Sequence, residues 1–370
     1  MPVPESSERP PKVSVIMAAY NRAHELGEAI DSVLAQEFDD YELVVVDDGS
    51  TDGTESLVRA YGSKLRYLKK VNGGVASARN AGIAAARGHY LAYCDADDQQ
   101  FPFRLRAQLD VLDARPEVAL VFSDFKEWVG GEIVNDSVLH HRWLGPSARS
   151  FEQDLAHHFG SSVPAAALTG AVPSVYADRR VYFGRIHRWL TSVHPAWGCA
   201  IMARTEVVRS VGGHWEGVRA YEDWVLSAEI SKHHDLAFMD LPLLLYRVHP
   251  EQLTGRARLN AECYRDGLLH VWRSDPVFYG LHKEEIDRAM ATAYSILGEV
   301  EARDGNFAEA EENYRRALSA NFRVGWRPMI NLVLSSVHQR IPAGRLRRVL
   351  PTVLGQSKNR DREMSDGSAA

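Results

Sequence analysis

Four residues, Asp95-Ala96-Asp97-Asp98, place three carboxylates in one short stretch of the chain. They follow the apolar run 90–94, which is typical of a buried strand. A second acidic pair, Asp47-Asp48, follows another apolar run at 43–46. Open α/β sheets bind ligands at the carboxyl ends of their strands. Carboxylates gathered there are unfavourable unless a cation or a hydrogen-bonding ligand compensates them. The pattern therefore predicts a divalent-metal site for a phosphate-bearing substrate.

The elements that position these acids alternate between strand and helix over the first 125 residues. This alternation is the signature of a parallel sheet flanked by helices. Gly88 is the expected C-cap of the third helix. Apolar runs predict strands at 13–17, 42–47, 65–68, 89–94 and 118–122, and helical spacing predicts helices at 26–34, from 52 to about 61, at 75–86 and at 103–114.

Beyond residue 125 the pattern is less regular. Gly130-Gly131 between apolar runs predicts a hairpin over 126–139, whereas 140–195 matches no period. From about residue 257 only helical patterns remain, and 297–318 matches one tetratricopeptide-like helix pair. Between these regions we expect a strand at 199–203, helices at 205–211 and 221–233, and an extended segment at 236–246.

Bulk composition is that of a soluble globular protein, with 45% hydrophobic and 25% charged residues. The net charge of -6 gives no overall attraction for nucleic acid. Three widely spaced cysteines form neither a zinc spacing nor a disulfide framework, which predicts a reducing, cytoplasmic location. No secretory signal and no apolar stretch of bilayer-spanning length are visible.

One C-terminal segment, 326–354, combines apolar residues with several arginines. One interpretation places it on an anionic membrane surface, at the inner face of the membrane, where lipid-linked acceptors reside. The other interpretation is a closing helix of the helical region. The helical tail is also a candidate surface for protein partners or for homo-oligomer formation.

The motifs, taken in order over 13–250, resemble the family 2 glycosyltransferases of the GT-A fold. Each motif alone is weak, and their ordered series carries the resemblance. The matching residues are Val13-Ser14-Val15-Ile16 through Tyr20-Asn21, Val46-Asp47-Asp48-Gly49-Ser50-Thr51-Asp52-Gly53, Gly73-Gly74-Val75-Ala76-Ser77-Ala78-Arg79-Asn80-Ala81-Gly82, Asp95-Ala96-Asp97-Asp98, Glu222-Asp223 and Tyr246-Arg247-Val248-His249.

The resemblance implies an α/β, Rossmann-like GT-A domain over 12–255, with a nucleotide half (12–125) and an acceptor half (126–255). A flexible N-terminus (1–11) would precede it, and a helical region (256–355) and a disordered tail (356–370) would follow. The implied activity is inverting, metal-dependent transfer of a sugar from a UDP-sugar, or a dTDP-sugar, to a hydroxyl of a glycan, lipid-linked or other acceptor. Mn²⁺ or Mg²⁺ would be the cofactor, and bacterial surface polysaccharide or glycoconjugate synthesis the setting.

The resemblance also implies roles for individual residues. Asp48 would accept a hydrogen bond from the pyrimidine N3–H, because an ionised carboxylate accepts and cannot donate. Asp97 would be the direct metal ligand, and Asp95 would contact the ribose or a metal-bound water. Asp223 would be the catalytic base, with Glu222 as the alternative. The wider implied set is Ala19, Tyr20, Arg22, Arg79 and Ala96 for the donor, His249 for the metal, and Trp197, Trp224 and Asp98 for the acceptor.

Two other functions remain open at this point. A sugar nucleotidyltransferase would also join a Rossmann-like sheet to metal-binding aspartates. It would need a glycine-rich, basic triphosphate loop near the first strand, and 18–21 does not resemble one. The other function is a non-catalytic, transferase-like scaffold whose helical tail recruits partners.

Overall fold

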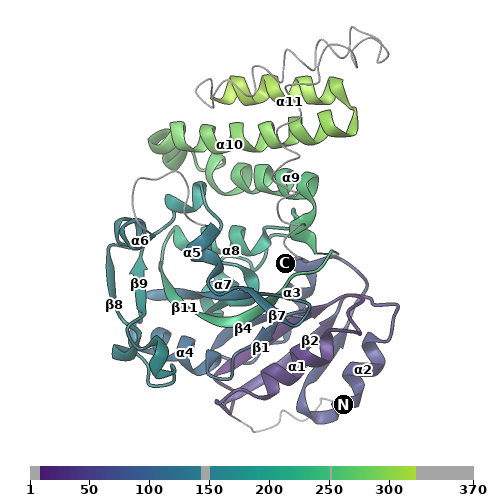
Figure 1. Cartoon of the computed structure of the whole chain (residues 1–370), viewed down its shortest axis with the longest axis vertical. Coiled ribbons are helices and arrows are strands. Elements are labelled where there is room, and N and C mark those ends of the chain that lie inside the picture. The colour runs from purple at the N-terminus through teal and green to yellow at the C-terminus, as the bar shows by residue number, and fades with distance from the viewer. Residues whose placement is uncertain (1–8, 143–150, 251, 322–370) are drawn as a thin grey trace, which may run out of the picture. The chain divides into compact units, whose positions relative to one another are not determined.

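The computed structural model describes residues 9–142, 151–250 and 252–321. Its N-terminal part has the predicted alternation of parallel strands and helices (Figure 1). Valine-rich strands buried on both faces explain the near-continuous apolar runs of the sequence. The elements are β1 (Val13–Ala19), α1 (Leu26–Leu34), β2 (Tyr41–Asp47), α2 (Thr54–Ala60), β3 (Arg66–Lys69), α3 (Val75–Ala85) and β4 (Tyr90–Asp95).

The described strands form one mixed sheet of 11 strands, which confirms the predicted α/β class. The strand order is β3-β2-β1-β4-β10-β6-β11-β9-β8, with β5 paired to β11 and β7 to β6. β10 (Ile201–Arg204) lies antiparallel between β4 and β6 (Val118–Val129). The alternation over the first 125 residues therefore gives four neighbouring parallel strands, but its fifth strand is separated from them by a strand from the second half.

The remaining elements include the predicted hairpin, which turns at Gly130 and Gly131 with positive φ. The unassigned segment 140–195 contributes a helix at 151–159 and the last two strands of the sheet order, at 180–184 and 161–164. The bounds are β5 (Gln99–Gln100), α4 (Arg104–Ala114), β7 (Glu132–Asn135), α5 (Val138–Arg142), α6 (Phe151–Phe159), β8 (Ser161–Pro164), β9 (Arg180–Gly184), α7 (Thr205–Ser210), α8 (Glu222–Ser231), β11 (Asp235–Arg247), α9 (Ala257–Leu268), α10 (Pro276–Asp304) and α11 (Phe307–Ala320).

The register of the sheet brings the acidic strand ends to one edge. β1 pairs with β2 on one side and with β4 on the other, so that Ala19 lies opposite Asp47 and Ala18 opposite Asp95. The chain leaves all three strands at the same end because they are parallel. This edge is the position at which open α/β sheets bind their ligands.

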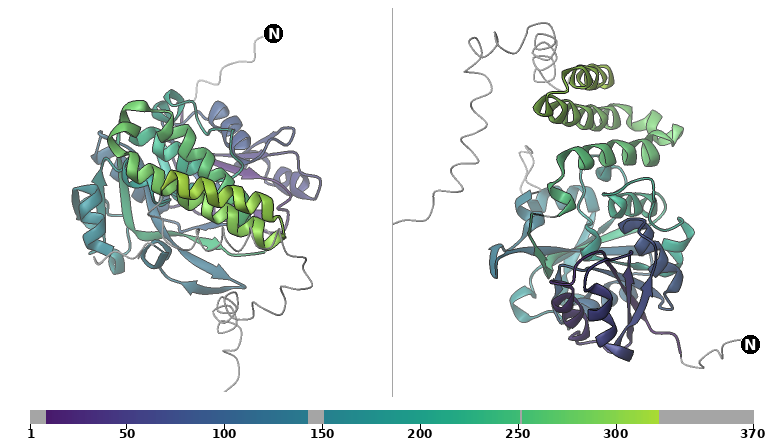
Figure 2. Two further views of the ribbon diagram at one scale, coloured as in Figure 1. Left: turned by 90° about the horizontal axis from the view of Figure 1, so that it is seen from above. Right: turned by 90° about the vertical axis from the view of Figure 1, so that its right-hand side faces the viewer.

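Two compact units divide the chain, Met1–His282 and Lys283–Ala370. α9 falls in the first unit, beyond the boundary that the sequence suggests at residue 256. In the second unit α11 runs beside the part of α10 that follows His282 (Figure 2). Gly298 lies so close to the Tyr314 ring that a Cβ there would be 2.6 Å from it. The small residue at this point lets the predicted helix pair pack closely.

The segment 326–354 and the tail 356–370 lie outside the described residues, so the proposed membrane and partner contacts stay predictions. Of the helices that are described, none has both the length and the hydropathy needed to cross a lipid bilayer.

Gly88 does not cap α3, contrary to the prediction. The helix ends at Ala85, and the C-cap residue Ala86 has extended φ and ψ. Gly88 instead lies against β1, where its N–H donates to Ser14 Oγ at 2.8 Å and a Cβ would lie 2.5 Å from Ser14 N. A glycine is needed here because two backbone segments approach each other, not because a helix ends.

Gly88→Ala should therefore lower the free energy of unfolding by about 1–3 kcal/mol, the usual cost of overpacking. Urea denaturation followed by circular dichroism measures it. Gly170→Ala is the matched control, because a Cβ at Gly170 meets no atom within 4 Å. Equal stability of the two variants would contradict the close approach.

Candidate active site

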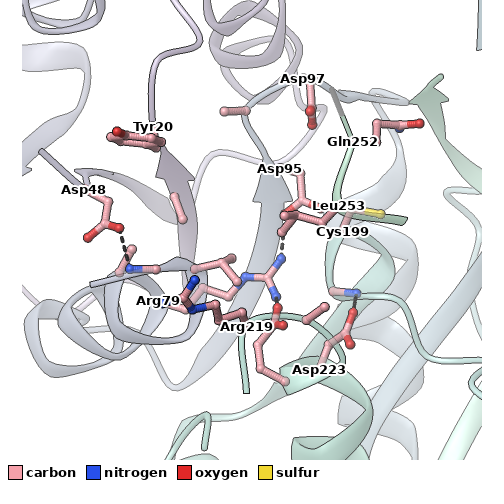
Figure 3. Close-up of a pocket in the computed structure, with 18 of the residues that line it drawn as sticks. Tyr20, Asp48, Arg79, Asp95, Asp97, Cys199, Arg219, Asp223, Gln252 and Leu253 are labelled. Atoms are coloured by element: carbon pink, nitrogen blue, oxygen red, sulfur yellow. Dashed lines mark hydrogen bonds and ion pairs between the residues drawn. The ribbon is translucent and has the colours of Figure 1, made fainter. Parts of the chain in front are cut away.

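A cleft of about 830 Å³ opens at the carboxyl ends of β1, β2 and β4. Segments from the second half of the first unit form its other side (Figure 3). Most of the predicted site residues line it, whereas Asp98, Trp224 and His249 do not. The predicted residues in the lining are Ala19, Tyr20, Arg22, Asp48, Arg79, Asp95, Ala96, Asp97, Trp197, Glu222 and Asp223.

Asp47 and Asp48 have different roles, which the sequence leaves open. Asp47 is fully buried and accepts hydrogen bonds from the Tyr67 hydroxyl at 2.6 Å and the Ser50 N–H at 2.7 Å, so it holds the turn. Asp48 lines the cleft, where Lys70 Nζ lies 2.8 Å from Oδ1. The backbone N–H groups of Gly73 and Gly74 donate to the same carboxylate at 2.7–3.1 Å.

Asp48 is therefore held rigidly at the cleft by three donors. A carboxylate has about four lone-pair sites, and the four contacts occupy them, because the Gly73 N–H is shared between both oxygens. Gly74 has a φ of +88°, a conformation that residues with a Cβ rarely adopt. The glycines at this position let the loop turn its N–H groups toward the acid just before α3 begins.

Arg79 is buried at the floor of the cleft, with 3% of its surface exposed. Its guanidinium donates to Asp95 Oδ1 at 2.6 Å and to Glu222 Oε1 at 2.5 Å (Figure 3). The sequence predicts a nucleotide contact for Arg79. In the structure its two terminal nitrogens each donate to a carboxylate, from the two halves of the unit, and the nucleotide contact stays a prediction.

Glu222 and Asp223 are neighbours in sequence but have opposite electrostatic settings. Burial raises the pKa of Glu222 to about 7, against the opposing charge of Arg79. Burial also acts to raise the pKa of Asp223, but the charge and hydrogen bond of His194, then Arg79, hold it well below its ordinary value. Asp223 is thus the carboxylate of the pair that remains ionised throughout the neutral pH range.

The position of Asp223 is fixed from several directions. His194 Nε2 lies 3.0 Å from Asp223 Oδ1, and the Gly198 N–H donates to Oδ2 at 2.6 Å. Tyr221, the N-cap of α8, has a φ of +66°, which is unusual for a bulky residue. This turn starts α8 with Glu222 directed to Arg79 and Asp223 directed to His194.

Asp97 and His249 come together from different parts of the chain. His249 Nε2 lies 3.0 Å from Asp97 Oδ2, and Arg22 Nε lies 3.6 Å from the same oxygen. Mn²⁺ can be bound by a carboxylate together with an imidazole. Mg²⁺ can be bound by a carboxylate together with water molecules. The residues present therefore fit a divalent cation at Asp97, next to the mouth of the cleft.

Asp98 is not an acceptor contact, contrary to the prediction. It is 1% exposed, and its Oδ1 accepts the Arg247 N–H at 3.0 Å. Asp95, Asp98 and Cys199 bring ligand atoms within 4.8 Å of one another. Burial raises the pKa of both the Asp98 carboxyl and the Cys199 thiol, and a thiol is a soft ligand. This cluster suits Mn²⁺ or Mg²⁺ less well than Asp97 does.

The two predicted tryptophans differ in position. Trp197 lines the cleft, donates its indole N–H to the His194 carbonyl at 3.1 Å, and packs against Tyr246 with ring centroids 5.1 Å apart. Trp224 is fully buried, and its indole N–H donates to the Leu190 carbonyl. The prediction for Trp224 is therefore wrong. This residue of α8 packs in the core, where its ring cannot stack on a sugar.

Small and exposed residues complete the β1 side of the cleft. Ala19 and Ala96 have short side chains at strand ends, which leave the backbone accessible to a ligand. Tyr20 is 49% exposed, so its ring is available at the rim.

Comparison with known families assigns this architecture. The model of glycosyl transferase family 2 matches residues 14–212. The chain belongs to glycosyl transferase family 2. An uncharacterised glycosyltransferase of Rickettsia typhi is 43% identical over 254 residues, which cover 69% of each protein. The protein is therefore a transferase, and the nucleotidyltransferase and scaffold alternatives are set aside.

Solved structures share the fold of this transferase. S. aureus TarS 1–349 in complex with UDP-GlcNAc aligns with a TM-score of 0.53 at 16% identity, over 88% of each chain. The mannosyltransferase PcManGT of Pyrobaculum calidifontis, in complex with GDP-Man and Mn²⁺, aligns with a TM-score of 0.50 at 20% identity, over 89% of this chain and 87% of that one.

Several cleft residues of the transferase escaped the sequence analysis. His194 lies in the unassigned segment 140–195, and no spacing connects it to Asp223. Arg219 and Arg256 line the cleft from loops before α8 and α9. A single arginine in a loop has no distinguishing local signal, so these residues could be found only from the fold.

Arg79→Met should lower the free energy of unfolding by about 3–5 kcal/mol at pH 8, because it leaves the buried Glu222 and the partly buried Asp95 without their cation. The loss should be smaller at pH 6, since the pKa of Glu222 is already raised and protonation there relieves the repulsion. Chemical denaturation at the two pH values measures this. Arg59→Met, at an exposed position of α2, is the control. A loss of stability in Arg79→Met that is the same at both pH values would contradict the charge argument.

Proposed function

We propose that this transferase moves a sugar from a UDP-sugar to a hydroxyl of a glycan or lipid-linked acceptor, with a divalent cation and with inversion at the anomeric carbon. The observation that carries the proposal is the convergence of Asp48, Asp95, Asp97 and Asp223 on one cleft. The acids come from three separate places in the chain, namely the turn after β2, the end of β4 with the turn that follows it, and the start of α8.

The position of Asp48 in the cleft favours a donor whose base is a pyrimidine. As a carboxylate, Asp48 can accept only from a donor such as the uracil N3–H, which would replace one of the two contacts that the Gly73 N–H shares. Thymine offers the same N3–H, so a dTDP-sugar is the alternative donor. Tyr20, beside it at the rim, supplies a ring face for the base or the ribose.

The acidic side of the cleft supports a cation that accompanies the diphosphate. Asp97, with His249, would hold it, and Asp95 lies next to them at the end of β4. When bound, a divalent cation neutralises the charge that develops on the leaving diphosphate. The presence of Mn²⁺ in the PcManGT complex, a protein of the same fold, is in keeping with this assignment.

Asp223 is the proposed catalytic base. As the acceptor oxygen forms its bond to the anomeric carbon, the bond from that carbon to the diphosphate oxygen breaks. The hydroxyl proton passes to the Asp223 carboxylate. Attack from α8, across the cleft from the nucleotide-binding turns, places the acceptor opposite the leaving group and gives inversion.

The lowered pKa of Asp223 is compatible with this role. An alcohol becomes strongly acidic only as its oxygen bonds to the electron-poor sugar carbon, so a weak base suffices late in the step. His194 and the Gly198 N–H keep Asp223 ionised and oriented until then. Glu222 is the poorer candidate because Arg79 already holds it.

Purified protein should bind UDP in the presence of Mn²⁺ and slowly release UDP from a UDP-sugar even without an acceptor. Asp97→Ala should weaken Mn²⁺-dependent UDP binding by at least about tenfold, as loss of a metal-site residue does. Calorimetric titration with and without chelator separates the metal-dependent part.

The control for this experiment is Asp136→Ala, which removes an exposed aspartate from the β6–β7 hairpin. If the wild-type protein binds UDP with neither Mn²⁺ nor Mg²⁺, the proposed donor is wrong. Asp97→Ala that keeps full Mn²⁺-dependent affinity would disprove only the metal assignment.

Asp223→Asn should leave UDP binding unchanged and slow UDP release by about 10²–10⁴-fold, the usual contribution of a general base. A normal rate in Asp223→Asn would exclude it as the base.

His194→Ala should move the acidic limb of the rate profile to higher pH. It removes the interactions that lower the pKa of Asp223, so the carboxylate becomes protonated at a higher pH. The wild-type rate should stay level from about pH 5 to 8, well above the lowered pKa. His194→Gln should restore part of the effect by returning a hydrogen-bond donor, and identical profiles of wild type and His194→Ala would contradict the role of His194.

A further inference from the structure

Four arginines line the cleft, and they fall into two pairs. Arg22 faces Asp97, and Arg79 is bound by Asp95 and Glu222. Arg219 and Arg256 have no side-chain hydrogen bond or ion pair with any residue that the structure describes, and both are exposed. The positive charge available to a ligand is therefore concentrated in the second pair.

Arg256 and Asn260 lie one turn apart at the start of α9, so both face the cleft from the same side of that helix. α9 begins without a side-chain cap and without an acidic residue in its first turn. The positive end of its dipole, with N–H groups that have no intrahelical acceptor, adds to the charge of Arg256.

Arg219 belongs to the same wall of the cleft. Its neighbours Val218 and Ala220 pack against Leu259 and Cys263 of α9, and the backbone at 219–220 hydrogen-bonds to the Cys263 thiol. Val218 and Ala220 are buried, whereas the Arg219 between them is exposed and lines the cleft (Figure 3). We call Arg219, Arg256 and the first turn of α9 the α9 wall.

We propose that the α9 wall binds an anionic group of the acceptor, a phosphate ester or a carboxylate. This inference rests on the proposed function. The acceptor is favoured over the donor because the wall adjoins Asp223, which lies four residues after Arg219, whereas the donor's diphosphate is assigned to the cation at Asp97. Arginine suits such a group because its planar fork can donate two hydrogen bonds to a phosphate or a carboxylate.

The test uses the full chain loaded with UDP and Mg²⁺ at low ionic strength. The probes are glycerol 1-phosphate and glucuronate, with glycerol and glucose as their neutral counterparts, titrated by calorimetry. The variant is Arg219→Gln with Arg256→Gln. Arg106→Gln, at an exposed position of α4 outside the cleft, is the control for loss of a positive charge elsewhere.

We expect at least one anionic probe to bind the wild type and the control alike, at least tenfold more tightly than the double variant, and neutral probes to bind none of them. UDP affinity should be the same in all three proteins. The tighter binder of glycerol 1-phosphate and glucuronate indicates whether the acceptor's charged group is a phosphate or a carboxylate. Arg219→Lys with Arg256→Lys should restore part of the affinity, since it keeps the charge and loses the fork.

Three results would overturn the inference. One is the absence of binding by either anion to the wild type, and another is equal binding to wild type and double variant. The third is a tenfold loss of UDP affinity in the double variant, which would assign the arginines to the donor's diphosphate. Failure of the proposed function has a different signature, namely wild-type protein that binds no UDP with Mg²⁺ or Mn²⁺.

Discussion

The bond between buried Arg79 and the carboxylates of Asp95 and Glu222 is the interaction on which the cleft depends. It joins residues 143 positions apart in the chain, and so ties the nucleotide-binding turns to the start of α8. A buried arginine without its acids, or the acids without arginine, would be strongly unfavourable. The two halves can therefore close only in the arrangement that brings all three groups together, and this arrangement places Asp223 opposite Asp48.

Gly198 shows how closely this arrangement is packed. A Cβ at this position would lie 2.5–2.8 Å from the Arg79 guanidinium, and its N–H donates to Asp223. One residue without a side chain thus admits the arginine and orients the proposed base. The same short segment carries Cys199 beside Asp95 and leads into β10, the antiparallel strand that separates β4 from β6.

Local patterns were enough to predict β1, β2 and β4 from their apolar runs, and Asp48, Asp95 and Asp97 lie at the ends of the last two. The insertion of β10 was not predictable, because a four-residue apolar strand does not encode its partner. Asp98 and Trp224 were misplaced for a related reason. Asp98 sits one residue beyond the acids that face the cleft, and α8 is buried on most sides, so an aromatic residue on it has no periodic signal. His194, in a segment without periodicity, became visible only through its distance from Asp223.

The cleft has two electrostatic sides, and this constrains the order in which substrates meet it. On the side of β1, β2 and β4, acids outnumber available cations, because Arg22 and Arg79 are already engaged. A diphosphate approaching alone would be repelled there, so a cation must arrive before it or with it. On the α9 wall the arginines have no counter-ion among the residues that the structure describes, and attraction for an anion there needs no metal. A ligand with a single negative group and no cation would therefore favour the α9 wall, whereas a nucleotide diphosphate with its cation would favour the strand ends. This separation of charge would give the proposed anionic group of the acceptor and the diphosphate of the donor different places in one cleft.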